Sequence, residues 1–170
     1  MPLTHLVGCD EFGAHIIPQG DRKWELKGAQ HVDSMFSKDK RQYTGDLAID
    51  AAGNVIAIHM IFAGKTDRSL PSSECRELFP KFVFHKTNNH WCDHASKVAF
   101  VERIYCVLKE KEAALKGIPV NQVGPFRCVL LLDCWPVNLT ALFRAEIKEK
   151  CPGMILFYIP AGGTGTYQVH

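Results

Sequence analysis

Residues 127–159 read RCVLLLDCWPVNLTALFRAEIKEKCPGMILFYI. Two apolar runs, Arg127–Asp133 and Met154–Ile159, flank a segment whose apolar residues recur at helical spacing. Asn138 suits the N-cap of a helix over Asn138–Lys150, and Pro152-Gly153 ends it. The residues expected to face inward from this helix are Leu139, Leu142, Phe143 and Ile147. Nearly continuous apolar strands suit a buried parallel sheet, so this stretch predicts a strand–helix–strand unit of an α/β fold.

The preceding part of the chain predicts further strands. Leu3–Asp10 fits a short strand, and Tyr43–Asp50 with Val55–Phe62 fits a hairpin closed at Ala51–Asn54. Both faces of Val55–Phe62 are largely apolar, which predicts helices over both. Gly64–Asn89 is expected to be irregular.

A long helix is expected before the apolar stretch that ends in Asp133. It starts near Asp93 or Ser96, and Gly117 with Pro119 ends it. Its apolar stripe is Val101, Ile104, Tyr105 and Leu108. The whole order predicts one domain over residues 1–170, with a mixed sheet, an N-terminal antiparallel hairpin portion and flanking helices.

Composition excludes several classes of protein. The 170 residues are 46% apolar and 22% charged, with a net charge of +2, which excludes a strongly basic nucleic-acid tail and an acidic tail. The 7 cysteines are odd in number, and no CxxC pair occurs, which predicts a reducing, intracellular compartment. No apolar run approaches the roughly 18 residues of a membrane span, so no membrane association is expected. No signal peptide is visible.

Two acids follow apolar strands. Asp10 follows Leu6–Cys9, and Asp133 follows Val129–Leu132. Ligands gather at strand ends in α/β sheets, and paired carboxylates favour Mg²⁺ or Mn²⁺. Two such ions activate water in phosphodiester cleavage. The alternative is that each aspartate caps a turn or a helix.

The ordered motifs resemble a known family. Asp10-Glu11-Phe12-Gly13 is similar to the first-acid motif of the DDE superfamily endonucleases, the catalytic cores of pogo, Tigger and centromere-protein-B-like transposases. Leu131-Leu132-Asp133 resembles the second-acid motif. The further similar segments are Asp39–Thr44, Gly64-Lys65-Thr66, Ser69-Leu70-Pro71, Trp91-Cys92-Asp93, and Pro160 with Thr164 and Gln168.

This resemblance implies a ribonuclease-H-like fold, DNA as partner and metal-dependent DNA cleavage or strand transfer. Asp10 and Asp133 would be both the catalytic and the metal-binding residues, with no small-molecule cofactor. A nuclear location, an origin in a transposable element and a homodimer are further expectations. The family pattern places its third acid directly after His170, and Val169 and Cys134–Asn138 depart from that pattern. These departures motivate the alternative of a domesticated, non-catalytic module that binds nucleic acid or protein.

Basic residues near the predicted hairpin are the candidates for phosphate contact. Lys40 and Arg41 precede the hairpin, and Lys65 follows it, with Lys38 and Arg68 nearby. The alternative is a solvated charged loop.

Other motifs in the sequence indicate a functional role less strongly. Glu11 is expected to contact metal-bound water or to be solvated, and turn chemistry explains Asp50. The cluster His85, His90, Cys92 and His94 has side chains that suit zinc, but its spacing favours surface histidines. Cys9 is expected in the core, Cys134 near the site, and Gly162–Gly165 in a flexible loop.

Overall fold

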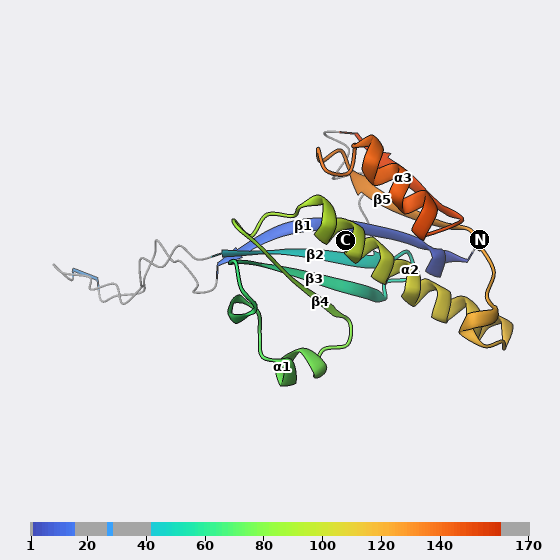
Figure 1. Cartoon of the computed structure of the whole chain (residues 1–170), viewed down its shortest axis with the longest axis horizontal. Coiled ribbons are helices and arrows are strands. Elements are labelled where there is room, and N and C mark those ends of the chain that lie inside the picture. Colours follow the sequence, from blue (N-terminus) through green and yellow to red (C-terminus); the bar gives the residue numbers. More distant parts are fainter. Residues whose placement is uncertain (1, 16–26, 29–41, 161–170) are drawn as a thin grey trace.

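A six-stranded mixed sheet forms the centre of the molecule, with strand order β4-β3-β2-β1-β5-β6 (Figure 1). The structure is a computed structural model that describes residues 2–15, 27–28 and 42–160. The strands are β1 (Leu6–His15), β2 (Gln42–Asp50), β3 (Val55–Ala63), β4 (Phe82–Thr87), β5 (Cys128–Asp133) and β6 (Met154–Ile159). The helices are α1 (Ser73–Glu77), α2 (His94–Lys116) and α3 (Ala141–Lys150), with short 3₁₀ turns at Leu3–His5, Asp67–Ser69 and Val120–Gln122. The predicted α/β class with an antiparallel hairpin portion is confirmed.

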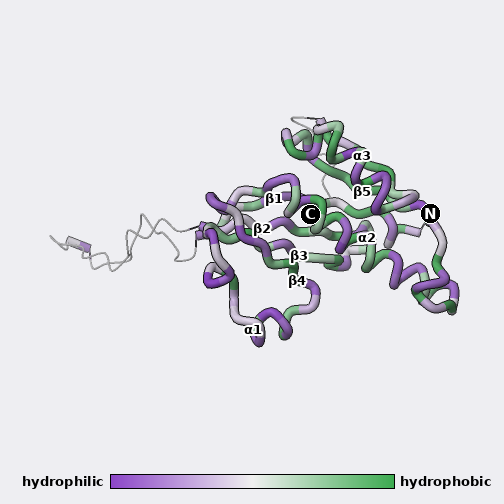
Figure 2. The backbone as a smooth tube through the Cα atoms, in the orientation of Figure 1, coloured by the Kyte–Doolittle hydropathy of each residue, from purple (hydrophilic) through white to green (hydrophobic). Residues whose placement is uncertain are grey.

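Helices α2 and α3 pack on one face of the sheet (Figure 1). The expected stripe of α2 is buried, and α2 alternates between hydrophobic and hydrophilic residues along its length (Figure 2). Asp93 caps its start by accepting from Ser96 N–H at 2.8 Å, and Gly117 ends it in the left-handed conformation at φ 64°. The prediction for this helix is therefore confirmed at both ends. None of the described helices is both long and apolar enough to cross a membrane.

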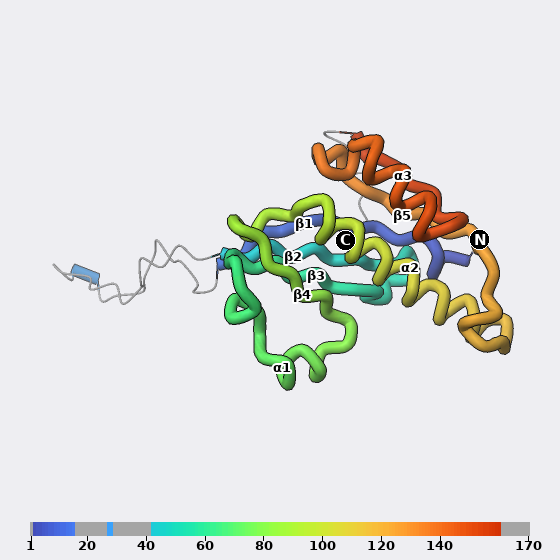
Figure 3. Tube along the Cα trace, in the orientation of Figure 1, coloured from blue at the N-terminus to red at the C-terminus, as the bar shows by residue number. Residues whose placement is uncertain are grey.

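The first strand joins the two halves of the sheet. β1 runs antiparallel to β2 and parallel to β5, which is parallel to β6. In Figure 3, β1 from the N-terminal part of the chain lies alongside β5 from the C-terminal part. Strands from opposite ends of the chain therefore become neighbours. The predicted hairpin of β2 and β3 is confirmed, and Asp50 Oδ1 accepts from the N–H groups of Ala52 (3.0 Å) and Asn54 (2.8 Å) in its turn.

Two strand predictions need correction. The sequence predicts a strand over Leu3–Asp10 that ends at the acid. In the structure β1 begins at Leu6 and continues to His15, because its second half pairs with β2. Asp10 therefore lies inside a strand. The segment expected to be irregular contains β4, a parallel edge strand beside β3.

Two packing predictions were also wrong. The second helix begins at Ala141 with Thr140 as its cap, so Asn138 is not a helix cap, and Leu139 and Leu142 are exposed while Phe143 and Ile147 are buried. β3 is not covered equally on its two faces. Its residues on the side of α2 are buried, whereas Ile58, Met60 and Phe62 are half-buried on the opposite face.

Candidate functional site

The two predicted acids line one cleft of about 380 Å³. Glu11 lines the same cleft. The other lining residues are Phe12, Gly13, Gln42, Thr44, His90, Trp91, Cys92 and Trp135. Of the candidate residues named from the sequence, the structure thus places Asp10, Glu11 and Asp133 around this cleft, together with His90 and Cys92.

The register of the parallel strands explains this meeting. Leu6 lies opposite Val129, and Gly8 lies opposite Leu131. The same register carried two residues further places Asp10 opposite Asp133, where the pairing of β1 with β5 has ended. The pairing of the two strands ends at Gly8 and Leu131, and both acids line the cleft two residues beyond it.

Asp133 lies in an environment that disfavours its charge. Burial raises its pKa above the ordinary value, and the nearby negative charges of Glu11 and Asp10 add to that shift. Lys97 and the Trp135 backbone N–H oppose the rise. A carboxylate under this repulsion gains from a cation or a proton between the acids.

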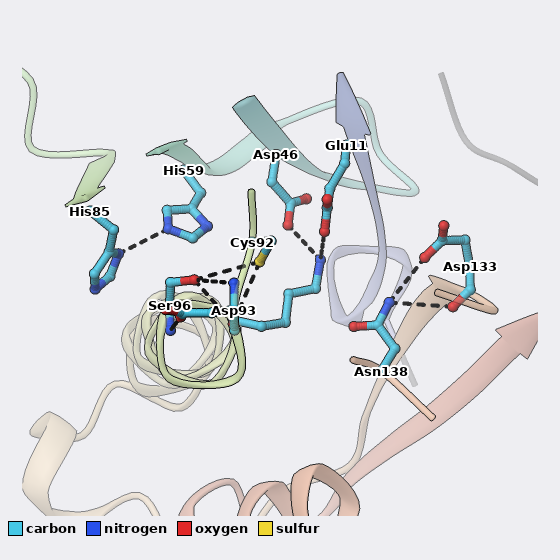
Figure 4. Close-up of polar contacts among 10 residues, drawn as sticks. Glu11, Asp46, His59, His85, Cys92, Asp93, Ser96, Asp133 and Asn138 are labelled. Atoms are coloured by element: carbon cyan, nitrogen blue, oxygen red, sulfur yellow. Dashed lines mark hydrogen bonds and ion pairs between the residues drawn. The ribbon is translucent and has the colours of Figure 1, made fainter. Parts of the chain in front are cut away.

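Asn138 fixes the orientation of Asp133, a contact that the sequence prediction missed. Its side-chain amide donates to Asp133 Oδ1 at 2.9 Å and to the Asp133 carbonyl at 3.3 Å (Figure 4). Asn138 is fully buried. The sequence alone predicts a helix cap at this position, because asparagine serves both roles.

A buried lysine lies beneath the cleft. Lys97 on α2 is 2% exposed, and its Nζ contacts Asp46 Oδ2 at 2.5 Å and Glu11 Oε1 at 3.0 Å. Burial lowers the pKa of Lys97, but the charges of Asp46 and Glu11 outweigh it, so its pKa is raised well above the usual value. Burial raises the pKa of Asp46 to about 6, against the opposing effect of Lys97. Glu11 is therefore an ion-pair partner, not a freely solvated neighbour.

A sequence signal for Lys97 existed. Lys97 precedes Val101 by four residues, so it lies on the apolar stripe of α2. A charge at such a position requires a partner inside the protein. Its partners come from β1 and β2, which no local pattern identifies.

Lys65 and Arg68, the candidate phosphate contacts that the structure describes, do not line the cleft. Lys65 is exposed in the loop after β3, outside the lining of the cleft. β3 runs antiparallel to β2, as β1 does, so this loop lies at the sheet end toward which β1 runs from Asp10. Lys40 and Arg41 lie outside the described residues.

The histidine and cysteine cluster divides among several partners. His85 shares a 2.9 Å hydrogen bond with His59, His90 one of 3.2 Å with Thr44, and His94 one of 2.8 Å with Glu146, while Cys92 contacts Ser96. In residues 2–15, 27–28 and 42–160, no group of three or more His, Cys, Asp or Glu side chains is arranged to hold a metal ion. Of the three metal-binding acids that the resemblance implies, the described residues therefore include two, Asp10 and Asp133.

The two cysteines next to the acids have structural contacts. Cys9 is buried in the core, and burial raises the pKa of its thiol. Cys134 is exposed, and its thiol donates to the Ile159 carbonyl at 3.2 Å. Gly162–Gly165, Thr164 and Gln168 lie outside the described residues.

Comparison with known proteins identifies the fold. No protein-family model and no curated protein sequence matches the chain. The Mos1 mariner paired-end complex with Mn matches at a TM-score of 0.52 and 14% identity, over 89% of this chain and 35% of that chain. A pre-cleavage Mos1 transpososome matches at 0.54 and 13%, over 91% and 36%. The Mos1 strand transfer complex matches at 0.53 and 13%, over 91% and 34%.

The chain spans about a third of the length of these transposase chains. At such low identity the likeness establishes the fold alone. The protein has the ribonuclease-H-like α/β fold found in the catalytic core of a DDE transposase.

Proposed function

We propose that this protein is a DDE-type, transposase-derived domain that binds DNA and acts in metal-dependent cleavage or transfer of a DNA strand. The observation that carries the proposal is the meeting of Asp10 and Asp133 in one cleft, at the same level of two neighbouring parallel strands. The similar fold occurs in a strand transfer complex and in a paired-end complex with Mn, which supports both the reaction class and the metal.

The chemistry of the acids fits a hard divalent cation. Asp10 and Asp133 supply carboxylate oxygens, which Mg²⁺ and Mn²⁺ prefer. The raised pKa of Asp133 reflects burial and the nearby negative charges of Glu11 and Asp10, and a cation would relieve both. Bound there, the ion would activate water or a DNA 3′-hydroxyl for attack on a phosphodiester.

Neighbouring side chains prepare the acids for this role. The Asn138 amide and the Trp135 backbone N–H bind Asp133 and fix its carboxylate. Lys97 holds Glu11 in an ion pair, so Glu11 contributes negative charge to the cleft from a fixed position. Preorganised charges of this kind lose little free energy in rearranging when a ligand arrives.

Phosphate contacts form the second half of the proposal. Lys65, Lys40 and Arg41 are proposed to bind the DNA backbone beside the cleft. A protein of net charge +2 that uses few cations should bind DNA modestly and with strong salt dependence. Lys65→Glu should weaken DNA binding without changing Mn²⁺ affinity, because Lys65 lies outside the cleft lining.

A nicking assay tests the proposal. Supercoiled plasmid is incubated with Mn²⁺ and the chain, and also with the chain extended beyond His170 by a segment carrying an acidic residue. Nicking is expected from at least the extended protein, with a loss of 100-fold or more in Asp10→Asn and Asp133→Asn. Glu149→Gln, which removes an exposed carboxylate on α3, is the matched control and should nick normally.

The alternative predicts a different result. A folded, DNA-binding protein that gives no metal-dependent nicking in either form would favour the non-catalytic module. Nicking that survives both aspartate substitutions would show that the activity does not belong to this cleft.

A further inference from the structure

A second cavity of about 470 Å³ adjoins the cleft that holds the acids. The two cavities share Trp91, Cys92 and Trp135 in their linings. Its remaining lining includes Thr87, Asn88, Asn89 and Pro136. The indole rings thus form the boundary between the acids and this neighbouring space.

The two tryptophans form a pair from separate loops. Their ring centroids are 6.0 Å apart with an interplanar angle of 44°. Trp91 precedes α2 and is 54% exposed, and Trp135 follows β5. Two large aromatic rings at the edge of a cleft offer apolar surface on which a flat ligand can stack.

The backbone around Trp91 is held in place. Its carbonyl accepts from the Thr87 hydroxyl at 3.0 Å, and its N–H donates to Asn89 Oδ1 at 3.3 Å. His90 before it has a φ of 59°, in the left-handed region that non-glycine residues rarely adopt. The Thr44 hydroxyl lies 3.2 Å from His90 Nδ1. The Trp91 ring is therefore presented by an ordered turn.

The lining favours a neutral flat ligand over a phosphate. Among the described residues that line the cavity, none is a lysine or an arginine, and Asp93 contributes a carboxylate. Indole rings stack on nucleobases, and asparagine amides pair with the edges of bases. A space of about 470 Å³ accommodates a base with its sugar.

We propose that Trp91 and Trp135 form a stacking site for an unpaired DNA base, next to the nucleotide whose phosphate lies at Asp10 and Asp133. This inference rests on the proposed function, because the shared walls place the base beside the acids. It assigns the cavity a substrate: the single-stranded or frayed end of a DNA strand.

Binding to labelled oligonucleotides tests the stacking site without a metal ion. The ligands are a blunt duplex, the same duplex with an unpaired end, and the single strand, all in EDTA. Wild-type protein should prefer the unpaired forms. Trp91→Ala and Trp135→Ala should each weaken that binding by about 5- to 150-fold, the range measured when one stacking aromatic is removed. Trp91→Phe should retain most of the affinity.

A matched control and a second readout separate stacking from folding. Phe79→Ala removes an exposed aromatic side chain that lines neither cavity, and should bind DNA as wild type does. In a Trp24→Phe background, Trp91 and Trp135 are the only tryptophans, and with selective excitation of tryptophan, unpaired DNA should quench their fluorescence more than the blunt duplex does.

The outcomes are distinct from those of the nicking assay. The stacking site is wrong if Trp91→Phe, Trp91→Ala and Trp135→Ala, with normal thermal unfolding, all bind unpaired DNA as wild type does, whether or not nicking occurs. It is also wrong if the blunt duplex binds and quenches as strongly as the unpaired end. Preference for an RNA strand over a DNA strand would overturn the assignment to DNA while leaving stacking intact.

Discussion

Lys97 is the residue whose environment differs most from that of an ordinary surface lysine. Its ammonium group is buried and contacts Asp46, which is 0% exposed, and Glu11, which is 23% exposed. Removing either member of a buried ion pair leaves an uncompensated charge, whereas removing both is often neutral. The lysine and Asp46 therefore depend on each other.

Lys97→Met should lower the free energy of unfolding by about 3–5 kcal/mol, because Asp46 is left buried without its cation. Asp46→Leu should cost a similar amount, and the double variant should recover most of the loss. Urea denaturation of the wild type, the two single variants and the double variant measures this double-mutant cycle. Lys86→Met is the control, since its partner Asp67 is 83% exposed and such exposed ion pairs contribute little to stability. Additive losses in the double variant would contradict the pairing.

The α2 helix shows what element boundaries depend on. Asp93 accepts from Ser96 N–H, and the Ser96 hydroxyl accepts from Asp93 N–H at 3.0 Å, which forms a reciprocal capping box. Asp93→Ala should lower the free energy of unfolding by about 1 kcal/mol, because the Ser96 N–H in the first turn loses its side-chain acceptor. Asp93→Asn or Asp93→Ser should recover most of it. Thermal unfolding of the three variants checks this, and equal stability of all would argue against the cap.

Local signals explain which elements were predictable from sequence. Asp93 and Gly117 carry their own capping chemistry, so α2 was predicted correctly at both ends. β4 was missed because a parallel edge strand depends on pairing with β3, and no short pattern reports that register. The strand predicted from the sequence ends too early, at Asp10, because the second half of β1 depends on its pairing with β2.

The same distinction applies to the site. Asp10 and Asp133 stood out because an acid follows an apolar run in each case, and strand register brings them together. The sequence predicts Asn138 as a helix cap, which is wrong, because the residue type alone does not reveal its hydrogen bond to Asp133. The partners of Lys97 lie 51 and 86 residues away, beyond any local pattern.

Across the whole molecule, His59 links sheet and helix through a neutral ring. It is 0% exposed, stacks on Phe100 of α2 at 5.0 Å, and shares a 2.9 Å hydrogen bond with His85 of β4. Burial lowers its pKa to about 3, and the nearby charges of His85 and Lys97 add to the shift. In the folded state His59 therefore stays neutral at pH values below about 6.5, where the same side chain takes up a proton in the unfolded chain.

This difference predicts acid sensitivity. The contribution of His59 to stability is complete above pH 6.5 and is lost as the pH falls toward about 3, at up to about 1.4 kcal/mol per pH unit. His59→Gln should flatten the dependence of the melting temperature on pH between 4 and 6.5. His85 also has a lowered pKa and should leave a residual slope. Identical slopes in wild type and variant would contradict this role of His59.

The central claim is that Asp10 and Asp133 together form a site for a divalent cation. Calorimetric titration of Mn²⁺ into the wild-type chain, Asp10→Ala, Asp133→Ala and the control Glu149→Ala tests it most directly. The account predicts binding by wild type and by the control, and a loss of at least tenfold in affinity in each aspartate variant. Equal affinity in all four proteins, or no binding to the folded wild type, would contradict it.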